Sequence, residues 1–374
     1  MNPLRRTSRR RTGERGQILV VAVIAMIGMI GGVSLVLEGG NAYAHQRIVQ
    51  NGSDSIANAG AMVIAQHLGG APRTDGQVAA AANTMSTANG LEGYVAYYTD
   101  VYGHLITPLG TQAANTTTAA KVGASLTNTI PPGSQGIQVS GTQSFPTSFA
   151  RVIGMNDFRA TADATARAGA LTGGGIMPLV FPVNIVDCSV AGDLGTGEAN
   201  WTISEPGEPP VGQEYIVPLC KSGAGSFMVL DLDGTLNNCE DEVANPPNLQ
   251  FPAFPLDLAT DNGNNCGKPM ADEMNLRAGQ VILVPVCDGQ CTTSGGVNGT
   301  YHIIKVAAFY VHYMSDQNSG NNPLCQGNGT TLKTLAGNGS SSCIVGWFVR
   351  YITSGPVGTG PITGAGAIGI QLIK

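Results

Sequence analysis

The architecture of this chain is decided by residues 15–40, RGQILVVAVIAMIGMIGGVSLVLEGG. The twenty residues from Ile18 to Leu37 include no ionisable side chain. As a helix rising about 1.5 Å per residue they span about 30 Å, the thickness of a bilayer's hydrocarbon core, and a helix satisfies its own backbone hydrogen bonds in lipid. The basic residues before them should stay cytoplasmic. We therefore expect a basic cytoplasmic segment at 1–16 and a transmembrane helix at 17–38.

A cleaved signal peptide is the competing interpretation of this stretch. Ala42-Tyr43-Ala44 would supply a small-residue cleavage site. However, a signal peptide has an apolar core of only about 7–15 residues, and this cut would lie several residues beyond the apolar run. The sequence favours a retained anchor. Inside it, Gly28 and Gly32 form a small-xxx-small pair that can let another membrane helix approach closely, although glycine is common in membrane helices anyway.

Composition argues for an extracytoplasmic protein and against nucleic-acid binding. Charged residues make up 12% of the 374 residues and hydrophobic ones 43%, with 52 glycines. This apolar content argues against disorder. The net charge is −6, and the first 16 residues hold six arginines and one glutamate, so the rest of the chain carries −11. Such a charge offers nucleic acid no basic face.

The cysteines are confined to the C-terminal half of the chain. An even number of cysteines beyond an export segment predicts a disulfide framework, whose connectivity the sequence leaves open. A zinc site is the alternative, but paired CxxC motifs are lacking and the histidines are scattered. The eight candidates are Cys188, Cys220, Cys239, Cys266, Cys287, Cys291, Cys325 and Cys343.

The residues after the apolar run favour a helix that continues outward as far as Leu68. Alanine and straight-chain residues are frequent there, the next proline is Pro72, and Gly69-Gly70 supplies a stop. Joined to the membrane segment, this helix would be roughly 75 Å long. We assign 39–70 to this outer extension and expect a second helix over Gly76–Ala88.

Two further regions are expected beyond this helix. Region 71–174 should be α+β, with a hairpin, a short helix and two strands before a boundary at Gly173-Gly174-Gly175. These elements are Gly93–Ile106, Ser148–Ile153, Gly136–Val139 and Phe158–Ala168. Region 175–374 should be a β-rich domain stapled by disulfides. Its expected strands are Met177–Val186, Phe227–Leu232, Val281–Val286, Tyr301–Met314, Cys343–Thr353 and Ile368–Ile373.

The N-terminal segment resembles the TadE/TadG-like proteins of Tad (tight adherence, Flp) pilus assembly. The matching features are Arg-Gly-Gln before an apolar helix, an acidic residue with glycine after it, and a Gln-Asn…Asp helix rich in alanine. In this chain they are Arg15, Gly16, Gln17, Glu38, Gly39, Gln50, Asn51 and Asp54. The resemblance covers residues 14–68 well, residues 136–185 fairly and the cysteine-bearing half only loosely.

The chain departs from that family pattern in three places. The acidic residue after the apolar run is Glu38 where aspartate is usual. Gly52-Ser53 replaces an Ala-Ala pair, which should soften the outer helix. Val21 stands where pilins processed by a prepilin peptidase carry glutamate. The resemblance therefore implies an anchored assembly or accessory component, with other Tad pilus-assembly or pilin-like proteins as partners, and not a major pilin.

One motif in the C-terminal half suggests chemistry. VLDLDGTL (229–236) matches the opening motif of haloacid-dehalogenase-type phosphatases, in which Asp231 would be the nucleophile and Asp233 the acid/base beside Mg²⁺. The lysine and the later acidic pair that this chemistry needs are not evident, so a strand ending in an Asp-Gly turn is favoured. A loop-bound calcium ion is a second alternative. Its ligands would be Asp231, Asp233, Asn237, Asn238 and Glu240.

The sequence thus predicts a bacterial, single-pass membrane protein of class α+β, with its N-terminus in the cytoplasm and its bulk outside. Its expected function is structural, in Tad pilus biogenesis or surface adhesion, with the bilayer as one partner. We expect no enzymatic activity and no cofactor, with structural calcium as the open alternative. The rivals are a secreted or envelope-bound binding protein and a metal-dependent phosphatase.

Overall fold

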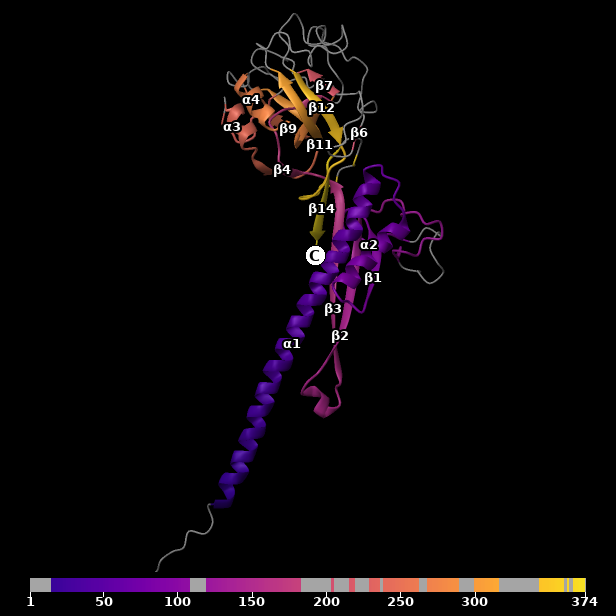
Figure 1. Ribbon diagram of the computed structural model, residues 1–374, viewed down its shortest axis with the longest axis vertical. Helices are drawn as coiled ribbons and strands as arrows, with labels where there is room; N and C mark the ends of the chain where they lie inside the picture. The colour runs from indigo at the N-terminus through magenta and orange to yellow at the C-terminus, as the bar shows by residue number, and fades with distance from the viewer. Residues whose placement is uncertain are drawn as a thin grey trace, which may run out of the picture.

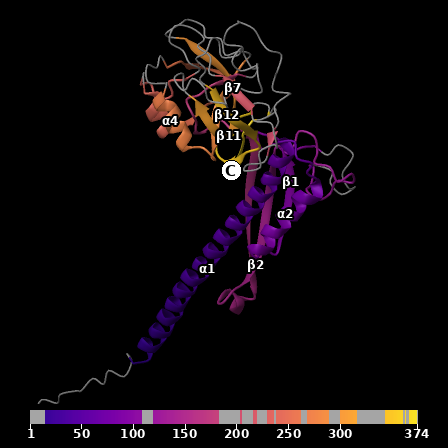
Figure 2. The same cartoon turned by 45° about the horizontal axis from the view of Figure 1, so that its top comes forward.

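One long helix, α1 (Arg15–Leu68, 54 residues), runs through the molecule and projects far beyond the rest of it (Figure 1). Its C-terminal part lies beside a sheet, while its N-terminal part stands clear of the other elements in both views (Figures 1 and 2). The computed structural model describes residues 15–107, 119–182, 203–204, 215–218, 229–235, 238–261, 268–288, 299–315, 343–359, 362 and 366–373. The predicted continuous helix is confirmed, at about 80 Å long.

Helix α1 ends where two glycines follow Leu68. Gly70 has a left-handed φ of +88°, and the amides of Gly69 and Ala71 donate to the carbonyls of Ala65 and Gln66. Helix α2 (Asp75–Ala88) begins after Thr74, whose side chain accepts from the Gln77 amide while the Gln77 side chain accepts from the Thr74 amide. This capping box sets the start of α2. The helix predicted over Gly76–Ala88 is confirmed.

A five-stranded sheet packs against the outer part of α1. Its strand order is β1-β2-β3-β14-β13. The strands are β1 (Gly93–Thr99), β2 (Gly136–Pro146), β3 (Asp157–Ala170), β13 (Ile352–Ser354) and β14 (Ile368–Ile373). All neighbours are antiparallel except β13 and β14, which are parallel. The last strand of the chain therefore pairs with β3, beside the N-terminal helix.

Small side chains let α1 lie close to this sheet. The alternate residues of β3 from Ala160 to Ala168 are buried alanines, and Ile56 and Ile64 of α1 pack into the same core as Ile137 of β2. At Gly60, a Cβ atom would lie 2.7 Å from Cδ1 of Ile137. Helix and sheet thus meet at a separation that larger residues would not permit.

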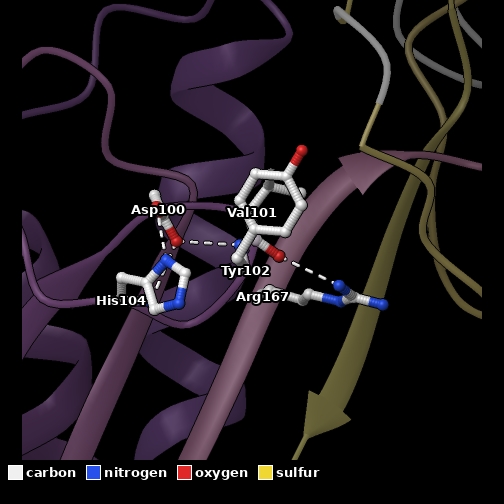
Figure 3. Close-up of polar contacts among 5 residues, drawn as sticks. All are labelled: Asp100, Val101, Tyr102, His104 and Arg167. Atoms are coloured by element: carbon white, nitrogen blue, oxygen red, sulfur yellow. Dashed lines mark hydrogen bonds and ion pairs between the residues drawn. The ribbon is translucent and has the colours of Figure 1, made fainter.

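A tight turn after β1 is tied to the C-terminal strand (Figure 3). Oδ1 of Asp100 accepts from the amides of Tyr102 and His104, at 2.8 and 2.9 Å. Partial burial raises the pKa of Asp100, but the hydrogen bonds from His104 and Tyr102 outweigh it, and the pKa lies below its ordinary value. Arg167 of β3 donates to the Val101 carbonyl at 2.9 Å and to Oε1 of Gln371 in β14 at 2.9 Å. Arg167 therefore links the turn after β1 to the C-terminal strand β14.

A second sheet forms the other unit of the molecule. Its order is β5-β10-β11-β12-β6, with β7 on β12 and β9 on β11. The strands are β5 (Phe181–Pro182), β6 (Ile203–Ser204), β7 (Tyr215–Pro218), β9 (Leu256–Ala259), β10 (Val281–Cys287), β11 (Thr300–Ser315) and β12 (Cys343–Val349). The core contains Phe181, Phe309 and Phe348, whose rings meet edge to face with centroids 4.9–6.1 Å apart.

Two short helices and a small strand pair complete this unit. They are α3 (Cys239–Ala244), α4 (Lys268–Leu276), β4 (Gly173–Gly175) and β8 (Asn248–Gln250). The amide side chain of Asn275 in α4 pairs with both backbone groups of Met314 in β11, at 2.9 and 2.8 Å. The sequence patterns did not indicate α3 or α4.

The order of strands revises the expected division of the chain. Residues 175–374 do not form one domain, because β13 and β14 complete the sheet of the preceding region. The second unit is instead inserted between β3 and β13. The predicted hairpin over Gly93–Ile106 is also changed: β1 pairs with β2, and the returning arm makes only the bridge Thr99–Leu105.

Candidate functional sites: an apolar helix and an acidic turn

The N-terminal part of α1, from Ile18 to Leu37, contains no buried residue, and we call it the bare half. Its large apolar side chains are between 50% (Val23) and 76% (Leu35) exposed. Among the described residues it is the one segment of helix that is long and apolar enough to cross a membrane. So large an apolar surface on a folded chain marks a contact with lipid or protein. The structure is compatible with a single-pass anchor.

The expected helix-packing residues lie on this exposed surface. A Cβ atom on Gly28 or Gly32 would meet nothing within 4 Å, so the small-xxx-small pair is open to a second helix. Arg15, Gly16 and Gln17 form the first turn of α1. Packing with another membrane helix remains a prediction.

Glu38 marks the end of the bare half. Its Oε1 accepts from the amides of Phe149 and Ala150, at 2.5 and 3.2 Å. These amides belong to the connection between β2 and β3, which contains the 3₁₀ helix η1 (Ala150–Ile153). The acidic residue of the family motif thus joins α1 to a segment more than a hundred residues away in the chain, a contact that the sequence did not reveal.

The segment from Ala42 to Leu68 is tied along its length to β2 and β3, and we call it the packed half. His45 stacks on Phe145, with ring centroids 4.2 Å apart. Gln46 and Gln50 donate to the carbonyls of Thr161 and Asp163, at 2.7 and 3.2 Å. These bonds use the outer edge of β3.

The remaining motif residues have structural contacts within or beside α1. Gln50 also donates to Oδ1 of Asp54 at 2.9 Å, and the Asn51 carbonyl accepts from Ser55. Helix α1 is continuous through Gly52-Ser53, and the expected softening there remains a prediction. A Cβ atom on Gly52 would lie 2.3 Å from Leu91, and buried Ser53 donates to the Ala162 carbonyl at 3.0 Å. Both residues are needed for packing.

An acidic cluster surrounds the Asp-Gly turn of the inserted unit. Asp231, Asp233 and Glu242 each offer a carboxylate oxygen within 4.8 Å of the others. Oδ1 of Asp231 accepts from the Gly234 amide at 2.7 Å, and Oδ1 of Asp233 accepts from Thr235 at 2.7 Å. The predicted Asp-Gly turn is confirmed, and the same oxygens could hold a divalent cation.

The third carboxylate comes from a residue that the sequence patterns missed. Glu242 of α3 takes the place expected for Glu240, which lies two residues earlier in the same helix and is exposed. Asn238 donates to Asp233 at 2.9 Å, whereas Asn237 lies outside the described residues. Oε1 of Glu242 accepts from the amides of Leu232 and Asp233, at 2.8 and 3.0 Å, while its buried Oε2 has no hydrogen-bond partner among the residues that the structure describes.

The pKa of Glu242 is raised from 4.5 to about 7. Burial is the largest cause, and the charges of Asp233 and Asp231 add to it, against the lowering effect of the two amide hydrogen bonds. Because the folded protein holds this proton more tightly than the unfolded chain, its stabilising contribution is complete below pH 4.5 and is lost as the pH rises through about 7.

The histidines and cysteines are partly described. Nδ1 of His302 lies 2.8 Å from Oδ1 of Asp257, and the His312 ring stacks on Trp347, so the two histidines have separate surroundings. The side chains of Cys239 and Cys287 are fully buried. The side chains of the other six cysteines lie outside the described residues, so the pairing remains a prediction.

Comparison of the chain with protein-family models, with curated proteins and with solved structures gave no match in any of the three searches.

Proposed function

We propose that the chain is anchored in a bacterial membrane by the bare half of α1, with the N-terminus in the cytoplasm and both sheet-containing units outside. The observation that carries this proposal is the change of surroundings along one unbroken helix. Up to Leu37 the large side chains are apolar and exposed, and from Ala42 onward the helix packs against β2 and β3. Twenty bare residues match a bilayer core of about 30 Å, and the arginines before them favour the inner side.

We propose further that this anchored protein is a TadE/TadG-like structural component of Tad pilus biogenesis or surface adhesion. The resemblance of Arg15–Gln17 and of Gln50–Asp54 to that family supports this assignment. The exposed Gly28 and Gly32 would offer a contact to another membrane helix, such as that of a pilin-like partner. Val21 supports a permanent anchor over a subunit processed like a pilin.

Membrane extraction and N-terminal mass mapping test the anchor. The full chain should stay with membranes at alkaline pH, and external protease should leave only a fragment containing residues 1–38. A mature chain beginning at His45, released by alkali, would overturn the anchor and favour a secreted binding protein.

Deletion of the gene tests the pilus assignment. Loss of surface pili or of adherence, restored by the full chain but not by a chain whose bare half is replaced with a cleavable signal, is the expected result. Normal pili and adherence in the deletion strain would overturn it.

We also propose that the cysteines form disulfides in the extracytoplasmic compartment. Their even number and the full burial of Cys239 and Cys287 support this. Mass spectrometry after alkylation without reduction should find none of the eight thiols modified. Alkylation of all eight in the folded, membrane-bound protein would overturn it.

A further inference from the structure

The connection between β2 and β3, residues 147–156, has a fixed shape, and we call it the hairpin tip. The Thr147 amide and hydroxyl donate to the Asn156 carbonyl at 3.0 and 3.1 Å. The Met155 amide donates to the Ala150 carbonyl at 3.1 Å, and Gly154 turns the chain with a φ of +90°. These bonds are made by backbone groups and one threonine, so exposed side chains of the tip can be changed without breaking it.

The hairpin tip lies at the level where the bare half of α1 ends. Strands β2 and β3 run beside α1 toward its N-terminal half, and their connection is the part of the two outer units that extends furthest in that direction (Figures 1 and 2). The hydrogen bonds from the Phe149 and Ala150 amides to Glu38 fix this position. Next to the tip, Phe145 at the end of β2 stacks on His45 of α1 and adds a second contact.

The surface of the tip combines apolar and basic side chains. Phe149 is 38% and Met155 53% exposed, and Arg151 between them is exposed. Aromatic rings are enriched where a membrane protein leaves the hydrocarbon core, and arginine can keep an apolar stem in that region while its guanidinium reaches the headgroup phosphates. Without a membrane or another partner, Phe149 and Met155 would expose apolar surface to water, which is unfavourable.

We propose that the hairpin tip is a second membrane contact, in which Phe149 and Met155 enter the outer interface of the bilayer and Arg151 binds lipid phosphate. This rests on the proposed function, because it requires α1 to cross the membrane. With residues 18–37 in the hydrocarbon, Glu38 lies at the outer boundary of the core. The Phe149 amide, 2.5 Å from the Glu38 carboxylate, is then within the headgroup region, which adds about 5–8 Å on each side of the core.

A second contact would fix the pose of the outer units. A single span can tilt and rotate, and interfacial aromatic and basic residues are among the features that set its tilt. Two contacts on different elements, joined by Glu38, would hold the first sheet at one angle to the membrane. A protein that assembles with neighbours in the same bilayer would thereby present its outer surface in one orientation.

Fluorescence of the full chain in bilayers tests this inference. Phe149→Trp places a reporter at the tip, in proteoliposomes of phosphatidylcholine and phosphatidylglycerol with or without bromine-labelled acyl chains. Tyr102→Trp is the matched control, because Tyr102 is 62% exposed and lies in the turn after β1, at the opposite end of the sheet. The unsubstituted chain supplies the background of the two native tryptophans.

We expect bromine to cause about a twofold loss of the added emission at position 149, since an interfacial ring lies about 5–10 Å into the boundary, and none at position 102. A second substitution, Arg151→Glu, in the Phe149→Trp variant should weaken the quenching at position 149. The weakening should be greater at higher phosphatidylglycerol content. Equal fractional quenching of the two variants by bromolipid, with α1 resistant to alkaline extraction, would overturn the tip contact alone. Extraction of α1 by alkali would overturn both the membrane crossing and the tip contact.

Discussion

The two halves of α1 share one helical backbone and face different surroundings. The bare half is built of bulky aliphatic residues such as Leu19, Ile24 and Ile30, all more than half exposed. In the packed half, small residues such as Ala57, Gly60 and Ala61 face the sheet, and polar ones bond to its edge. The bare half therefore needs only apolar area, as a lipid contact does, whereas the packed half needs side chains whose shapes match the sheet.

The largest difference between the halves is expected when one isoleucine in each half is replaced by alanine. Ile56→Ala removes a fully buried side chain and should lower the unfolding free energy of the outer units by about 2–5 kcal/mol. Ile27→Ala should leave it unchanged, because Ile27 is 65% exposed. Thermal unfolding of the full chain in detergent measures both. Equal losses would show that the two halves do not differ.

An added charge should disturb the bare half and leave the packed half unaffected, which is the reverse of the truncations. Ile27→Arg places a cation at the centre of the bare half, where insertion costs about 3 kcal/mol, and should deplete the alkali-resistant fraction. Ile48→Arg, at a side chain 43% exposed in the packed half, is the control and should insert normally. Normal insertion of Ile27→Arg would contradict a membrane-crossing role.

Added volume gives a third contrast. Gly60→Val meets Ile137 and should cost about 1–3 kcal/mol by overpacking, whereas a Cβ atom at Gly32 meets nothing within 4 Å among the described residues. Thermal unfolding should separate the two variants. If Gly32→Val unfolds normally yet abolishes pilus assembly, Gly32 contacts another membrane helix. An unchanged melting temperature in Gly60→Val would mean that α1 lies further from the sheet.

The inserted unit should respond to pH in a way that neither half of α1 does. Since Glu242 has a raised pKa of about 7, the stability of this unit should fall as the pH rises from about 4.5 to about 7. Glu242→Gln keeps an acceptor for Leu232 and Asp233 and should remove this dependence. Unfolding followed at pH 5 and pH 8 measures it. Calcium added at pH 8 tests the cluster as a cation site. If it raises the melting temperature of the unsubstituted chain but not that of Glu242→Gln, the cluster binds a cation.

The smallest effect is expected at the junction of the halves. Glu38→Ala removes the acceptor of the Phe149 and Ala150 amides, so amide exchange there should quicken while the global melting temperature stays unchanged. Glu38→Asp, the residue usual in the family, tests whether the shorter side chain still reaches. Unchanged exchange in Glu38→Ala would show that the tip is held without Glu38.

The elements predicted to within one or two residues of their bounds are those with strong local patterns. The uninterrupted apolar and alanine-rich run to Leu68 predicts α1, and the β-branched runs predict β10, β11 and β14. Helices α3 and α4 were missed because they are short and carry few apolar residues. The role of Glu242 was missed because its burial depends on contact with a turn about ten residues earlier.

The long helix, its apolar half and the turn at Gly234 follow from local sequence, because each depends on neighbouring residues and on backbone sterics. Three other features depend on tertiary packing: the final strand returns to β3, Glu38 binds the hairpin tip, and Gly52 and Gly60 allow close packing. These features join residues distant in the chain, and their free energy comes from shape and hydrogen bonding between surfaces that local patterns do not describe.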